Sequence, residues 1–133
     1  KSEPSDLSRI NLSDTQDQII NKIKKAKTDP LPMPTNLKDL DKRPEAKNLL
    51  GIYSSLKKTN LEKSVKEFSG KNFSEFKENL AQVLVDKIFP LSLEIKKLLN
   101  EKGFLDQILV EGAQKANDIA SNKIKEIHKI MGF

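Results

Sequence analysis

Apolar residues recur at helical spacing along most of the chain, in stretches separated by polar segments that contain proline or glycine. The first stretch covers residues 13–27. Ser13 is placed to cap a helix there, with Gln16 three residues later as in a capping box. Ile19 and Ile23 begin an apolar stripe, and lysines occupy the opposite face. This pattern predicts a first amphipathic helix.

Three prolines between residues 30 and 34 interrupt the helical pattern. Because proline has no backbone N–H, we expect an extended crossing over the surface there. Pro44 is suited to the first position of the next helix, which is predicted for residues 44–58. A short third helix follows, with Asn60 as its cap and Gly70 as its stop.

A long helix is predicted from Ser74 to Asn100. Its apolar stripe consists of Phe76, Leu80, Val83, Leu84, Ile88, Leu91, Ile95 and Leu98. Val85 and Phe89 lie off this stripe, so we expect the middle of the helix to be covered on two sides. Pro90 should kink or split the helix, and Gly103 should end it.

The last stretch, residues 104–131, carries another stripe. Its members are Leu105, Ile108, Leu109, Ala116, Ile119, Ala120, Ile124, Ile127 and Met131. Gly112 either breaks this helix or lets another helix approach closely. No strand-like alternation is present along the sequence. The expected fold class is therefore all-α, a bundle of about five helices with a kinked or split long central helix.

Composition agrees with a small helical domain that has a large wetted surface. Of the 133 residues, 36% are hydrophobic and 32% are charged, and cysteine is absent. The net charge of +5 fits either contact with a polyanion or simple solubility. Apolar runs are too short to span a membrane and no secretory signal is recognisable, so a cytoplasmic protein without membrane contact is expected.

No residue set in the sequence indicates catalysis by this chain alone. His128 is the only histidine and has no cysteine partner, so no metal site is expected. Lysines are the remaining candidates: Lys22, Lys24, Lys25, Lys27, Lys57, Lys58 and Lys71. They form either solvated helix faces or phosphate contacts to a nucleic acid. A base-stacking platform is disfavoured, because the six phenylalanines fall mostly on core stripes.

The order of several segments resembles a known family. They are TDPLP, RPEAKNLLGIYSSL, EFSGKNFSEFKENLAQVLVDKIFP and EGAQKANDIASNKIKEIHKIMGF. The specific markers are Pro44-Glu45, Asn48-Leu49-Leu50, Ile52-Tyr53, Gly70-Lys71, Phe76-Lys77, Leu80-Ala81, Pro90, Gly112-Ala113, Lys115-Ala116, Ala120 and Gly132-Phe133. Together they make essentially the whole chain similar to the C-terminal region of bacterial-type tryptophanyl-tRNA synthetase.

The resemblance implies a parent class I synthetase that activates tryptophan with ATP, with magnesium expected, and transfers it to tRNA(Trp) as a homodimer. Residues 1–12 would be the end of the KMSKS loop and a linker, and residues 13–133 the helical anticodon-recognition domain. The Rossmann catalytic domain would lie upstream and is absent here. The fragment alone is expected to be inactive, to bind no cofactor and to have no DNA partner.

Lys1 and Ser2 match the last two positions of the KMSKS signature. The resemblance implies that Lys1 is catalytic and binds the ATP phosphates, and that Ser2 supports the loop backbone in ATP binding. After Pro90 the family often has arginine or glutamine, whereas this chain continues with residues 91–93 as Leu-Ser-Leu. No tRNA-reading residue is therefore assigned.

Two alternatives compete with this interpretation. The chain would otherwise be a stand-alone basic helical module that binds RNA or protein. A tyrosine-specific relative is disfavoured, because the segments EGAQKANDIA and RPEAKNLLGIY fit the tryptophan branch.

Overall fold

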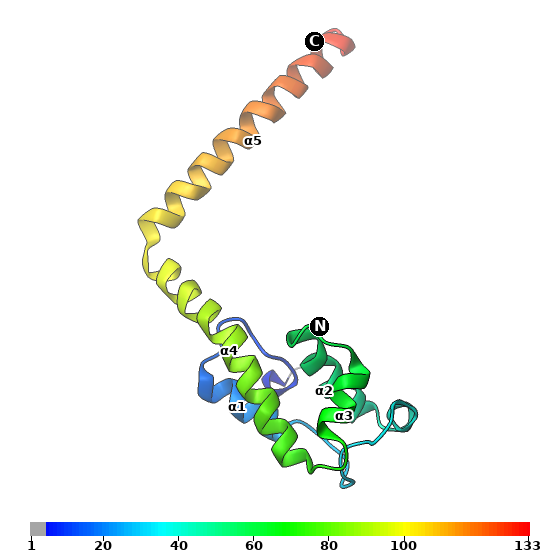
Figure 1. Cartoon of the computed structure of the whole chain (residues 1–133). Helices are drawn as coiled ribbons and strands as arrows, with labels where there is room; N and C mark the ends of the chain where they lie inside the picture. Colours follow the sequence, from blue (N-terminus) through cyan, green and yellow to red (C-terminus); the bar gives the residue numbers. More distant parts are fainter. Residues whose placement is uncertain (1–4) are drawn as a thin grey trace. The chain divides into compact units, whose positions relative to one another are not determined.

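Helices account for all the regular secondary structure in the computed structural model, which describes residues 5–133 (Figure 1). Their bounds are η1 Asp6–Ser8, α1 Gln16–Lys25, η2 Leu37–Lys42, α2 Pro44–Leu56, α3 Leu61–Phe68, α4 Phe73–Asn100 and α5 Lys102–Met131, where η marks a 3-10 helix. The chain divides into two units, one up to Leu93 and one from Glu94 to Phe133, so the division falls within α4. The expectation of an all-α protein is confirmed.

Three aromatic rings form the centre of the first unit. The Tyr53 and Phe68 ring centroids lie 5.0 Å apart, those of Phe68 and Phe76 lie 4.9 Å apart, and both pairs are edge-to-face. Such pairs contribute about 0.5–1.5 kcal/mol beyond the burial of their area. The surrounding buried residues are Ile19, Ile23, Met33, Leu40, Ala46, Leu49, Leu50, Val65, Phe73, Leu80, Ala81, Val83, Leu84 and Val85. Helices α1 to α4 thus share one core.

The first helix begins later than expected. Thr15, not Ser13, is the N-cap of α1: its hydroxyl accepts from the Gln18 amide at 3.3 Å, and the Gln18 side chain accepts from the Thr15 amide at 2.8 Å. The expected capping box is therefore present two residues downstream, and the prediction of Ser13 with Gln16 was wrong. Asp14 explains the shift, because its carboxylate accepts from the Asn11 amide at 2.8 Å and holds the preceding residues in a turn.

The end of α1 is fixed by a side chain from α4. The ammonium group of Lys77 donates to the carbonyl oxygens of Ala26 at 2.6 Å and Lys24 at 3.2 Å. These carbonyls would otherwise lack helical partners. Burial lowers the pKa of Lys77 from its ordinary value.

The proline-containing crossing is only partly an extended surface segment. It is followed by η2, and within it Met33 is buried, with its N–H donating to Lys71 O at 2.7 Å and its C=O accepting from Gly70 N at 3.2 Å. The expectation of an extended surface crossing is therefore confirmed only in part. Met33 lies between two prolines, which have no backbone N–H. Its own N–H is therefore the one that can donate to the turn after α3.

The start signals of α2 and α3 and the stop signal of α3 were predicted correctly, whereas α2 ends at Leu56, two residues before its predicted end. Pro44 is the first residue of α2, and Asn60 Oδ1 accepts from the Lys63 amide at 2.8 Å at the start of α3. After α3, Gly70 has a φ of +71°, which a glycine adopts without strain. The two helices also share a buried hydrogen bond, since the Ser54 and Ser64 hydroxyls lie 2.8 Å apart.

Helix α4 begins at Phe73 and runs through Pro90 without interruption, so it is not split there. Its middle is covered on two sides as expected, because Leu84 and Val85 are both buried. The helix ends at Asn100, and Gly103 lies in the first turn of α5. The prediction that Gly103 ends the long helix was therefore wrong.

No residue of α5 is buried. The stripe expected to face inward is exposed at Ile108, Ile119 and Ile127, among others. Gly112 neither breaks the helix nor marks a close approach, since a Cβ placed there would meet nothing within 4 Å. The C-terminal stop is Gly132, with a φ of +82°.

In the part of the chain that the structure describes, no helix combines the length and apolarity needed to cross a membrane.

Candidate functional site

The two residues that match the KMSKS signature, Lys1 and Ser2, lie outside the described residues. Their predicted roles in ATP binding therefore remain predictions. The nearest described segment, Ser5–Asn11, begins three residues after Ser2 and contacts α1 through η1.

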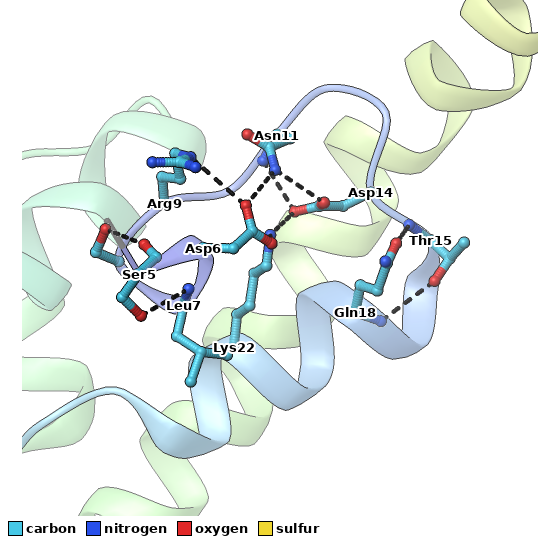
Figure 2. A network of polar contacts seen from close by, with 10 residues as sticks. Ser5, Asp6, Leu7, Arg9, Asn11, Asp14, Thr15, Gln18 and Lys22 are labelled. Atoms are coloured by element: carbon cyan, nitrogen blue, oxygen red, sulfur yellow. Dashed lines mark hydrogen bonds and ion pairs between the residues drawn. The ribbon is translucent and has the colours of Figure 1, made fainter. Parts of the chain in front are cut away.

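A polar cluster joins this segment to α1 (Figure 2). Its centre is the ammonium group of Lys22, which lies 2.8 Å from Asp6 Oδ2 and 2.7 Å from Asp14 Oδ2. Asn11 links the two carboxylates, because its Nδ2 donates to Asp6 Oδ1 at 3.0 Å and to Asp14 Oδ1 at 3.3 Å. Only 4% of Lys22 is exposed, so most of its stem lies against the protein.

The same segment is ordered by its own short-range contacts. Ser5 Oγ accepts from the Leu7 amide at 3.3 Å and caps η1, and the Ser8 hydroxyl donates to Ser5 O at 2.8 Å. Arg9 adds a second cation, with Nε 3.5 Å from Asp6 Oδ1. The cluster thus has two cations and two carboxylates, which balances its charge where Lys22 is shielded from water.

Asp14 and Lys22, which form the buried ion pair of the cluster, both have shifted pKa values. Burial alone would raise the pKa of Asp14, but hydrogen bonds from Lys22 and Asn11 outweigh it and lower the pKa overall. Burial would likewise lower the pKa of Lys22, and its bonds to Asp14 and Asp6 outweigh that and raise it. The hydrogen bond from Lys22 is the main cause of the lowered pKa of Asp6. All three groups are therefore charged at neutral pH.

A cleft of about 700 Å³ lies beside the cluster, between the N-terminal segment, α1 and α2. Its apolar lining includes Ile10, Ile23, Leu49 and Ile52. Its charged lining consists of Arg9, Lys22, Lys25, Lys27 and Glu45. The lining thus combines apolar side chains with four cations and one carboxylate.

The candidate lysines do not behave as one group. Lys22 is buried in the cluster, so the expectation that it belongs to a solvated face was wrong. Lys27 lies 3.4 Å from Glu45, and Lys71 lies 2.7 Å from Glu75. The exposed members are Lys24, Lys25, Lys27, Lys57, Lys58 and Lys71. These remain available at the surface.

Sequence reasoning missed the carboxylates of the cluster, although a signal was present. Lys22 is three residues after Ile19 and four before Ala26, so it lies on the apolar face of α1. A lysine on that face requires a buried partner. Asp14 and Asp6 supply it from the preceding segment.

His128 is exposed near the end of α5, with its ring 5.9 Å from that of Phe133. Within residues 5–133, no three His, Cys, Asp or Glu side chains come together as a possible metal site.

Comparison with known proteins places the chain in a family. A family model described as "tRNA synthetases class I (W and Y)" matches residues 1–89. Over 133 residues the chain is 42% identical to the tryptophan–tRNA ligase of Mesorhizobium japonicum, 44% to that of Rhizobium meliloti and 43% to that of Rickettsia typhi.

Each of these matches covers 100% of this chain and 38% to 40% of the relative. The chain therefore spans about two fifths of the length of the curated relatives it matches. The resemblance found in the sequence is confirmed, because the family model covers more than half of the chain and the identity extends over the rest. The chain belongs to the class I tRNA synthetases of the tryptophan and tyrosine group.

Proposed function

We propose that this chain is the C-terminal helical part of a tryptophan–tRNA ligase, beginning inside the KMSKS loop. The observation that carries the proposal is the 42% to 44% identity to such ligases over all 133 residues. The ligase would activate tryptophan with ATP and transfer it to tRNA(Trp), working in the cytoplasm as a homodimer. The catalytic Rossmann domain would belong to the part that precedes Lys1.

In the activation step, the tryptophan carboxylate attacks the α-phosphorus of ATP, and pyrophosphate leaves with the electrons of the broken P–O bond. Lys1 would place its ammonium group near the transferred phosphates and stabilise the charge that develops on the pyrophosphate. Ser2 would support the loop backbone. Magnesium would arrive on the ATP phosphates, which are its usual partners in such sites.

The helical part would contact the tRNA and recognise its anticodon. The net charge of +5 and the exposed lysines support an electrostatic contribution to this contact. The side chains that read bases are left unassigned, because lysine positions alone indicate phosphate contacts and not base contacts.

The test compares the full-length protein with this 133-residue chain in tryptophan-dependent ATP–pyrophosphate exchange and in aminoacylation of tRNA(Trp). Exchange is expected from the full-length protein with tryptophan and not with tyrosine. No exchange is expected from the chain alone. Exchange with tyrosine in place of tryptophan would refute the proposed substrate, and exchange by the isolated chain would refute its role as a non-catalytic part.

A further inference from the structure

The segment behind the KMSKS residues is held to the helical unit mainly by polar contacts. Leu7 is 47% exposed and Leu12 is 54% exposed, so each is only about half-buried. Ile10 packs against the core and supplies apolar contact. An ion pair between Asp6 and the ammonium group of Lys22 also joins the segment to α1.

This attachment lies close to the loop along the chain. Asp6 follows Ser2 by four residues and Lys1 by five. Since an extended chain spans at most about 3.6 Å per residue, five residues reach at most about 18 Å from the Cα of Asp6. Fixing Asp6 therefore limits the volume that the loop lysine can reach, whereas after release of Asp6 the next residue packed against the core is Ile10.

We propose that Asp6 and Lys22 are positioning residues for the KMSKS lysine. By tying η1 to α1, their ion pair fixes the end of the loop to the helical unit and sets where Lys1 meets the transferred phosphates. This inference rests on the proposed function, because it assigns the pair a part in that same reaction. Asp14 has a different role, since it keeps Lys22 paired within the fold when Asp6 is removed.

These separate roles of the two carboxylates allow a clean variant. The Asp6 side chain is 57% exposed, so Asp6→Ala leaves no cavity, and Lys22 keeps its 2.7 Å contact with Asp14. In the full-length protein, kcat for tryptophan-dependent ATP–pyrophosphate exchange is expected to fall about 10-fold or more, because small misplacements of catalytic groups are costly. The KM for tryptophan should stay within about twofold, since the pair does not touch the amino acid.

Two further variants make the result specific. Glu62→Ala removes another exposed carboxylate, which lies 2.8 Å from Lys66 on α3, and it should leave kcat unchanged. Asp6→Glu keeps a carboxylate within reach of Lys22 and should restore kcat to within about threefold of the wild type. A kcat for Asp6→Ala within twofold of the wild type would overturn the proposal, as would an Asp6→Glu enzyme as slow as Asp6→Ala.

Amide hydrogen exchange tests the anchoring without relying on activity. Amides of residues 7–11 should exchange at least about fivefold faster in Asp6→Ala than in the wild type, because local opening sets their exchange rate. Unchanged exchange would overturn the anchoring role. A wild-type protein without tryptophan-dependent exchange activity would refute the proposed function and this inference together, whereas an active wild type with an unaffected variant would refute the inference alone.

Discussion

The guanidinium group of Arg43 holds both carboxylate oxygens of Asp29, with Nε 2.9 Å from Oδ2 and Nη2 2.7 Å from Oδ1. Its Nη1 also donates to Pro32 O at 2.7 Å, and the group lies 5.6 Å from the centre of the Phe73 ring. Arg43 therefore fastens the proline-containing crossing to the start of α2. Because a lysine cannot form this planar set of contacts, Arg43→Lys should lower the free energy of unfolding by about 1–3 kcal/mol, measured by urea denaturation.

The matched control for Arg43 is the pair of Lys47 and Asp41, 3.0 Å apart with both side chains mostly exposed. Lys47→Gln should change the free energy of unfolding by less than about 0.5 kcal/mol, because exposed pairs contribute little. Equal losses in the two variants would contradict a special role for the bidentate contact.

The chain's one tyrosine gives a direct optical readout of core burial. Burial, together with the hydrogen bond to Glu67, raises the pKa of Tyr53 to about 12. The folded state thus favours the neutral phenol, so this contribution to stability is complete below pH 10 and is lost as the pH rises towards 12. Ultraviolet absorbance of the phenolate should show Tyr53 ionising at about pH 12 in the folded chain and at about pH 10 in urea.

Glu67 supplies the second cause of the Tyr53 shift, because its carboxylate accepts from the tyrosine hydroxyl at 2.8 Å. Glu67→Gln should bring the pKa of Tyr53 part of the way back, with burial keeping it above 10. A folded Glu67→Gln protein with the wild-type value would show that this carboxylate plays no part.

Much of the fold follows from local signals in the sequence. Pro44 marks a helix start because the first helical position needs no backbone N–H, and Asn60 marks one because its side chain accepts from a free amide of the first turn. The structure places both as predicted. The apolar stripes of the first four helices identified their buried faces for the same reason, although in α4 only as far as Ile88, since Leu91 is 49% exposed. These features depend on near neighbours along the chain, which a single sequence displays.

Features that depend on distant partners were not predictable in this way. Ser13 and Thr15 are both acceptable caps, and the choice depends on the turn that Asp14 makes with Asn11. The stripe on α5 has the right period for burial, yet period alone does not supply a partner surface. For the candidate site, the family resemblance predicts a role for Lys1, which lies outside the described residues, whereas the cluster around Lys22 needed three-dimensional contacts.

Acid should weaken the cluster that holds the N-terminal segment. The folded pKa of Asp14 lies below its ordinary value of 3.8, so the folded state binds fewer protons than the unfolded state there. Its stabilising contribution is present above pH 3.8 and is lost as the pH falls through the folded pKa.

Asp14→Asn tests this acid dependence, since Lys22 keeps Asp6 as a charged partner. The free energy of unfolding should fall by about 1–3 kcal/mol at pH 7, and its decline in acid should become shallower. Urea denaturation from pH 7 to pH 2.5 measures both. If the free energy of unfolding declines in parallel in the variant and the wild type, other carboxylates, such as Asp29, cause the loss of stability in acid.

Binding of tRNA tests whether the exposed lysines of α1 contact phosphates, a role that the buried lysine of the same helix is not expected to have. Lys24 and Lys25 are exposed on α1, whereas Lys22 is not. If both exposed lysines bind phosphates, the Lys24→Gln, Lys25→Gln double variant should reduce the slope of log affinity against log salt by about 1.4–1.8, at about 0.7–0.9 for each phosphate that is no longer neutralised.

Filter binding of tRNA(Trp) to the full-length protein between 50 and 200 mM salt measures these slopes. Lys47→Gln, whose ammonium is paired with Asp41, is the control for the loss of a surface lysine elsewhere and should leave the slope unchanged. Affinity that does not change with salt, or equal slopes for the double variant and the wild type, would exclude phosphate contacts by this face of α1.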